Sequence, residues 1–293
     1  MTKKYSIILT LIVLVIVISG CIEKENIINN PYKDSSQPKK LKDIIDEHEK
    51  DELKFAIIGD PHTVSYNISN RGNERLGLIM DFVNKQDIDF VVIMGDVTDD
   101  GTDESNDLAK KILKESTKSY YTVAGNHDIL LSPKMFERYY GPMEHIEVVK
   151  GFQLIFVGIY DTRDKNGNVT KLGWKFDFEK ANKNMPTLIF MHGTVLDPPS
   201  ECDYCNWGPK NGDGFFKYAA SMKPELDKFT NLLGVYSGHV HYNSDQTLNN
   251  TIYVTINGLI DKPITGYFAY ASNDIGYTII KDEKLSYKLI SYK

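Results

Sequence analysis

Residues 90–99 read FVVIMGDVTD, an unbroken apolar run that stops at a glycine and an aspartate. The run at 90–94 has the length and apolar character of a strand buried on both faces. Gly95 lets the chain turn and leaves Asp96 at the carboxyl end of that strand, where open α/β sheets bind ligands. An unpaired charge is costly to bury. Asp96 is therefore either a functional group or a structural aspartate that caps the next helix.

The same sequence of a strand followed by polar residues recurs along the chain. Further strands are predicted at residues 53–58, 120–124, 152–160, 187–191, 234–237, 252–256, 277–280 and 285–289. Apolar residues at helical spacing predict helices at 74–85 and 104–114, and a further helix that begins near Pro224. Ser132 and Pro133 are typical of an N-cap and a first helical residue. Strands that alternate with helices in this way indicate an α/β fold.

Five of the seven histidines directly follow predicted strands, and two aspartates and one asparagine occupy the same kind of position. These eight residues are Asp60, His62, Asp96, Asn126, His127, His192, His239 and His241. Carboxylate, amide and imidazole donors without a thiolate suit divalent Mn, Fe, Zn or Co. The set is large enough for two ions that share a bridging carboxylate. Taken singly, each motif has an ordinary alternative, such as turn chemistry at Asp60-Pro61.

The order of the motifs resembles that of the calcineurin-like metallophosphoesterase family. The matching blocks are Asp60-Pro61-His62, Gly95-Asp96-Val97-Thr98-Asp99, Gly125-Asn126-His127-Asp128, His192 and Gly238-His239-Val240-His241. The last motif, Gly-His-x-His, is similar to the corresponding motif of the subgroup that includes class III cyclic-nucleotide phosphodiesterases. The resemblance implies an α/β fold that is a four-layer αββα sandwich, with two facing mixed sheets flanked by helices.

The resemblance also implies a role for each matching residue. Asp60, His62 and His241 hold one divalent metal ion, Asn126, His192 and His239 hold the second, and Asp96 bridges both. His127 is catalytic and faces the substrate phosphate and the leaving oxygen, while Asp99 orients it. The implied reaction is hydrolysis of phosphomonoesters or phosphodiesters by attack of a metal-bridging hydroxide. The alternative is a non-catalytic dimetal protein that binds phosphate or metal.

Substrate choice is expected to depend on the loops at 63–73 and 161–175. Arg71 and Arg163 in these loops are candidates to pair with phosphate, although a surface arginine is more often a solvated charge. The formal net charge of -6 lacks the basic field of a nucleic-acid-binding protein, so no nucleic-acid binding is expected. The partner that the resemblance implies is a phosphoester substrate.

The N-terminus predicts export and anchoring. Lys3 and Lys4 precede an apolar run at 7–18, which is short for a membrane-spanning helix and typical of a signal peptide. Ile18-Ser19-Gly20-Cys21 resembles a prokaryotic lipobox, which implies cleavage before Cys21 and a lipid on its sulfur. The alternative is an uncleaved signal anchor. Either arrangement places the chain outside the cytoplasmic membrane and anchored to it.

Three segments are therefore predicted. Residues 1–21 are a signal peptide with a lipobox, polar residues 22–50 are a flexible tether, and 51–293 are the metallophosphoesterase domain. Within that domain, residues 197–218 are an irregular insertion that is either a lid over the site or surface packing. It contains Cys202 and Cys205, for which a local disulfide is expected in an exported protein and thiol-redox activity is the alternative.

Overall fold

We analysed a computed structural model of the chain, which describes residues 52–67, 71–166, 169–196, 220–260, 267–272 and 276–281. The predicted signal peptide, Cys21, the tether, the insertion with Cys202 and Cys205, and the strand at 285–289 lie outside these residues and stay predictions. Residues 48–293 form one compact unit. None of the helices in the described ranges combines the length and the apolar character that a membrane crossing requires.

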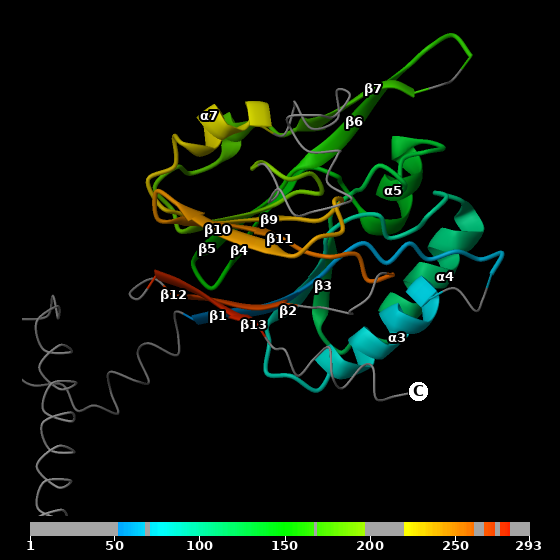
Figure 1. Ribbon diagram of the computed structural model, residues 1–293, viewed down its shortest axis with the longest axis horizontal. Helices are drawn as coiled ribbons and strands as arrows, with labels where there is room; N and C mark the ends of the chain where they lie inside the picture. Colours follow the sequence, from blue (N-terminus) through cyan, green and yellow to red (C-terminus); the bar gives the residue numbers. More distant parts are fainter. Residues whose placement is uncertain are drawn as a thin grey trace, which may run out of the picture. The chain divides into compact units, whose positions relative to one another are not determined.

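The first sheet contains five strands in the order β13-β12-β1-β2-β3 (Figure 1). Its strands are β1 (Glu52–Ile58), β2 (Phe90–Ile93), β3 (Ser119–Thr122), β12 (Tyr267–Ser272) and β13 (Gly276–Lys281). The strands β1, β2 and β3 are parallel, and β12 pairs antiparallel with β1. The helices α3 (Arg71–Val83) and α4 (Asp103–Leu113) connect the parallel strands, as the alternating pattern predicts.

The second sheet contains six strands in the order β10-β11-β9-β8-β5-β4. Its strands are β4 (His145–Val149), β5 (Phe152–Phe156), β8 (Thr187–Phe190), β9 (Leu232–Ser237), β10 (Ser244–Leu248) and β11 (Thr251–Thr255). The four central strands are parallel, and each edge strand pairs antiparallel with its neighbour. Both sheets are thus mixed.

Aromatic side chains fill the space between the two sheets. Phe55 of β1 stacks on Phe90 of β2 at a ring-centroid distance of 5.1 Å. The edge of Phe55 meets Phe190 of β8 at 5.7 Å and Tyr236 of β9 at 5.5 Å. All four side chains are fully buried. These contacts pack the two sheets face to face and hold the carboxyl ends of their parallel strands close together.

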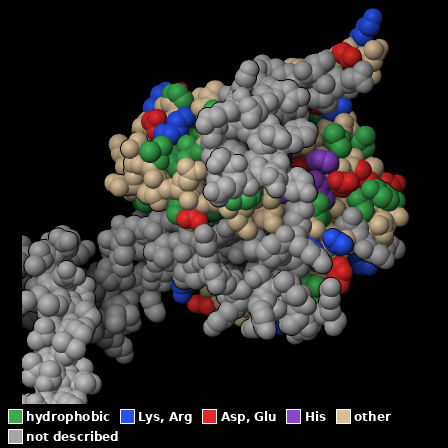
Figure 2. Space-filling model, viewed as in Figure 1, with side chains coloured by type: hydrophobic (Ala, Val, Ile, Leu, Met, Phe, Trp, Pro, Cys, Tyr) green, Lys and Arg blue, Asp and Glu red, His purple; other side chains and the backbone are tan. Residues whose placement is uncertain are grey.

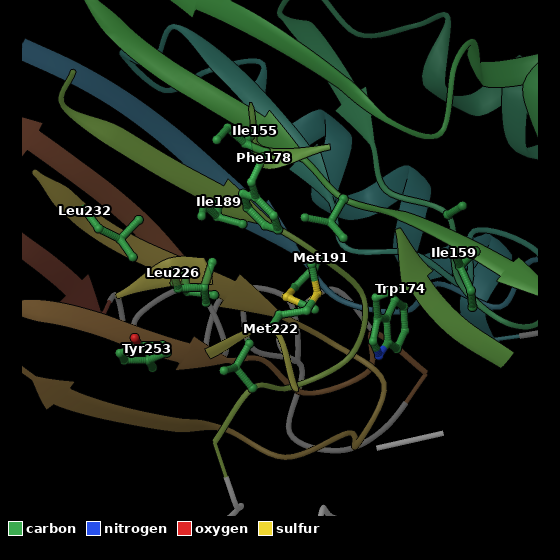
Figure 3. Close-up of a cluster of buried hydrophobic side chains, with 14 of the residues drawn as sticks. Ile155, Ile159, Trp174, Phe178, Ile189, Met191, Met222, Leu226, Leu232 and Tyr253 are labelled. Carbon is green, nitrogen blue, oxygen red and sulfur yellow. The ribbon is translucent and has the colours of Figure 1, made fainter. Parts of the chain in front are cut away.

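The outer faces of the sheets are covered differently. The apolar stripes of α3 and α4 pack on the first sheet. The second sheet is covered by α5 (Pro133–Tyr140), the single-turn helices η2 (Phe178–Lys180) and α7 (Lys223–Leu226), and the hairpin of β6 (Gly158–Arg163) and β7 (Val169–Lys175). Figure 3 shows Phe178, Leu226 and Trp174 against this face, and Figure 1 shows the hairpin extending past it. The predicted fold of two facing mixed sheets flanked by helices is confirmed.

Two element predictions were wrong. The run at 152–160 is not one strand, because β5 stays in the second sheet while β6 leaves it to pair with β7. The helix near Pro224 is a single turn. Leu232, which follows it at helical spacing, instead begins the buried strand β9. In both places one apolar run continues through two elements. The contacts that each part makes in the folded chain determine where the first element ends.

Candidate metal centre

The nine predicted metal and catalytic residues all lie in loops at the carboxyl ends of five strands. Asp60 and His62 follow β1, Asp96 and Asp99 follow β2, Asn126 and His127 follow β3, His192 follows β8, and His239 and His241 follow β9. Because the two sheets face each other, these loops meet at one edge of the sandwich. Figure 2 shows histidine side chains at the surface there, bordered by acidic and hydrophobic side chains.

Potential ligand atoms gather in two main groups. The donor atoms of Asp60, His62 and His241 lie within 4.8 Å of one another, and so do those of Asp96, His192 and His239. Asn126 adds its Oδ1 at 3.1 Å from His192 Nε2. These two groups correspond to the two ligand sets that the resemblance implies, and a third group of His62, Asp96 and His127 overlaps both.

Asp96 lies between the two groups. Its Oδ2 is 3.6 Å from His62 Nε2 and 3.2 Å from His192 Nε2. Its Oδ1 accepts the backbone N–H of His127 at 2.8 Å. The position suits a bridging carboxylate. The helix-capping alternative for Asp96 is wrong, because the side chain of Thr102 caps α4.

The backbone at the site is strained. Positive φ angles, which non-glycine residues rarely adopt, occur at Asp60 (20°), His62 (47°), Asp96 (46°), His239 (68°) and His241 (49°). Such conformations persist only where surrounding structure enforces them, and they are concentrated at functional sites.

Glycines make this close packing possible. A Cβ on Gly125 would collide with the carboxylate of Asp96, and one on Gly238 would collide with that of Asp60. Gly125 and Gly238 thus give their loops room to approach a carboxylate.

Hydrogen bonds outside the ligand groups orient the imidazoles. His192 Nδ1 donates to the carbonyl of Met94 at 2.7 Å, so this nitrogen carries the proton and Nε2 faces the centre. His62 Nδ1 lies 2.9 Å from Asp99 Oδ1, which directs His62 Nε2 inward in the same way. Histidine ligands of metals are generally held by such partners.

Asp60 provides an independent test of whether the residues fit a cation. Its carboxylate is completely buried, and Oδ1 accepts no hydrogen bond from the part of the chain that the structure describes. Oδ2 accepts the backbone N–H of His239 at 2.8 Å and lies 3.1 Å from His241 Nε2. A buried carboxylate oxygen without a donor is costly unless a cation is beside it. The donor set therefore fits divalent metal ions.

The pKa shifts in the metal-free site also show that its carboxylates favour a positive charge beside them. Burial alone would lower the pKa of His192, but the charges of Asp96 and Asp60 outweigh it and raise that pKa to about 9. Burial and the charge of His192 lower the pKa of His239 to about 3. Burial alone would raise the pKa of Asp96, but His192 holds it far below its usual range. The two carboxylates thus hold a proton on His192 when no metal is present.

His127 lies beside the ligand groups with its ring partly exposed. Its Nδ1 donates to the carbonyl oxygen of Asp99 at 2.6 Å, and Asp99 Oδ1 lies 3.3 Å away. The ring meets that of His62 edge-on at 4.7 Å. The predicted contact between Asp99 and His127 is present, but its shortest distance is to the backbone carbonyl of Asp99. The Asp99 carboxylate lies closer to His62 than to His127.

Two further residues support the site and were given no supporting role from the sequence. Buried Asp128 accepts the backbone N–H groups of Val97 (3.2 Å), Thr98 (2.9 Å) and Gly125 (2.9 Å) and so ties the two loops that follow β2 and β3. Burial and the charge of Asp96 raise the pKa of Asp128 to about 6. In the sequence, the only sign of this role is the position of Asp128 at the end of the block Gly125-Asn126-His127-Asp128.

Arg163, a candidate to pair with phosphate, contacts protein groups in the structure. Its guanidinium pairs with Asp161 through Nε at 2.6 Å. It also donates to the carbonyls of Leu130 (3.0 Å) and Ile129 (2.8 Å), which directly follow the His127 loop. Arg163 therefore ties the β6–β7 hairpin to that loop.

Comparison with known proteins agrees with this geometry. The profile of a family described as "Calcineurin-like phosphoesterase" matches residues 53–243, more than half of the chain. A "Probable cyclic nucleotide phosphodiesterase" of Fibrobacter succinogenes is 26% identical over 214 residues, which cover 70% of this chain and 77% of the relative. A "Probable glycerophosphodiester phosphodiesterase GpdQ" of Arcobacter nitrofigilis is 28% identical over 179 residues, covering 57% and 62% respectively.

Among solved structures, a dimetal phosphatase from Danio rerio superposes with a TM-score of 0.55 at 13% identity. The match covers 78% of this chain and 98% of that structure, and it supports the fold.

Proposed function

The chain belongs to the calcineurin-like phosphoesterase family and is a metal-dependent hydrolase of phosphoester bonds, and we propose that its reaction takes place at two divalent metal ions held by the residues described above. One set is Asp60, His62 and His241, and the other is Asn126, His192 and His239. Asp96 is the shared ligand. The observation that carries this proposal is the position of Asp96 Oδ2 between His62 and His192.

The chain's own residues divide the chemistry between them. Two divalent ions, once bound, would supply a nucleophile at neutral pH and neutralise phosphate charge. The two carboxylates and five imidazole or amide ligands fix that charge at one place. His127, with Nδ1 held by the carbonyl of Asp99, presents Nε2 toward the phosphate. In its protonated form it hydrogen-bonds a phosphate oxygen and gives its proton to the departing alkoxide.

We infer that the substrates are phosphodiesters rather than monoesters. Both curated relatives are named as probable phosphodiesterases, one for cyclic nucleotides and one for glycerophosphodiesters.

The location proposed for the chain is outside the cytoplasmic membrane, anchored through a lipid on Cys21. The support is the basic start, the apolar run at 7–18 and the lipobox-like sequence 18–21. The mass of the mature N-terminus in a prokaryotic host tests this, since retention of residues 1–20 would favour the uncleaved anchor instead.

Hydrolysis of a bis-aryl phosphodiester tests the proposed function. The full chain, purified in detergent and stripped by a chelator, is expected to be inactive, and Mn(II) is expected to restore turnover. An aryl phosphomonoester is run in parallel and is expected to react more slowly. Faster monoester turnover would contradict the diester assignment. Metal-loaded protein that hydrolyses neither ester would support the non-catalytic alternative.

A further inference from the structure

We propose that Tyr66, Leu130 and Leu131 form a binding surface for a neutral aromatic group on the substrate, such as a nucleoside base. We call these three side chains the apolar rim. The inference rests on the proposed function and specifies the class of phosphodiester that the site takes.

The rim stands out by its exposure. Tyr66 is 75% exposed, Leu130 44% and Leu131 54%. In the described ranges only two other large hydrophobic side chains are comparably exposed, Val148 (61%) and Leu248 (42%). Those two lie on the edge strands β4 and β10, whereas the three rim residues lie on loops that carry site histidines.

The rim residues are close in sequence to His62 and His127. Tyr66 is four residues after His62, and Leu130 and Leu131 are three and four residues after His127. The backbone N–H of Leu130 donates to the carbonyl of His127 at 3.3 Å, so the chain turns tightly there. The rings of His62 and His127 are 4.7 Å apart, so the two rim loops start from one place. Figure 2 shows hydrophobic side chains beside the exposed histidines.

The loop that carries Tyr66 is held firmly. Buried Asn73 accepts the backbone N–H of Val64 at 3.0 Å and donates to the carbonyls of Val64 (2.8 Å) and Asn67 (3.1 Å). The backbone N–H of Ser65 donates to Ser105 Oγ at 3.0 Å. The ring of Tyr66 is thus exposed, and hydrogen bonds hold the backbone on both sides of this residue.

The second rim loop is held by the pair of Asp161 and Arg163. Arg163 donates to the carbonyls of Ile129 and Leu130, the two residues before Leu131. Exposed apolar side chains on loops that are already ordered lose little entropy when a ligand packs on them. Tyrosine in particular offers a rigid, flat surface at low entropic cost.

The charges beside the opening favour a neutral group. Asp99 lies three residues after Asp96, next to His62 and His127, and its carboxylate is 40% exposed. Like charges in a site raise the cost of binding a second anion. A leaving group with further phosphates is therefore disfavoured, and an uncharged aromatic group is favoured.

The test uses two matched diesters, a nucleoside 5′-methyl phosphate and the 5-(methyl phosphate) of 1-O-methylribose, which differ in the presence of the base. With the Mn(II)-loaded full chain, kcat/KM is expected to be about tenfold higher for the nucleoside ester, the size of one base–aromatic stacking contact. Tyr66→Ser, and separately the double substitution Leu130→Ser with Leu131→Ser, are expected to bring this ratio toward one, mainly through KM.

The matched controls are Val148→Ser and Leu248→Ser, which remove exposed hydrophobic side chains away from the site and are expected to leave the ratio unchanged. A wild-type ratio near one, or a ratio unaltered in Tyr66→Ser protein that keeps its melting temperature, overturns the inference while the phosphodiesterase activity stands. Loss of all turnover in the wild type, with the bis-aryl diester included, instead overturns the proposed function.

Discussion

Asp96→Asn is expected to lower kcat/KM for the bis-aryl diester by more than about 100-fold, beyond the usual cost of altering a residue that only supports a metal ligand. Asp96 Oδ2 lies between His62 and His192, so loss of its charge weakens both ligand groups at once. It also removes the carboxylate that helps to raise the pKa of His192 to about 9. The measurement is steady-state turnover at saturating Mn(II).

A matched control separates this effect from a general change of charge. Asp87→Asn removes an exposed carboxylate that pairs with Lys54 at 3.0 Å, and it is expected to leave turnover within twofold of wild type, as is usual for surface substitutions. Folded, metal-loaded Asp96→Asn protein with activity within tenfold of wild type would contradict the bridging role.

His127→Ala is expected to affect substrates according to their leaving groups. For a diester with an alkoxide leaving group, kcat is expected to fall by about 10²–10⁴-fold, the range for a positioned general acid. For an aryl diester the loss is expected to be much smaller, because a weakly basic aryloxide departs without a proton. The structural basis is that the Asp99 carbonyl holds Nδ1, so in the proposed role Nε2 is the nitrogen that donates the proton.

The control for removal of an imidazole is His145→Ala. His145 lies in β4 and stacks on Phe156 at 4.4 Å, away from the ligand loops, so both substrates should react as with wild type. An equal loss of rate for aryl and alkyl diesters in His127→Ala would mean that His127 acts by binding phosphate and not by donating a proton.

The ligand loops could be predicted from the sequence because their signal is local. A buried strand, a glycine and a candidate metal ligand follow one another at Asp96, and the pattern repeats at Asn126 and His239. The helix α3 was equally clear, since Leu76, Ile79, Met80 and Val83 form one apolar stripe.

The supporting contacts could not be predicted because they join distant segments. Asp128 reaches the backbone of Val97 and Thr98 in a different loop, and Arg163 reaches the chain after His127 from the hairpin. Polar residues such as these look like surface residues until the fold brings their partners close. The edge strand β10 was missed for a related reason, because its residues are mostly exposed and show no alternating apolar pattern.

The central claim, a pair of metal ions sharing Asp96, is tested most directly by titrating metal-free full-length protein with Mn(II) and recording the electron paramagnetic resonance spectrum. Two Mn(II) per chain with an exchange-coupled signal are expected. Uptake at neutral pH should also release a proton, because His192, whose pKa is about 9, must lose its proton to bind metal. A single Mn(II) per chain, or two ions without magnetic coupling, would contradict the account.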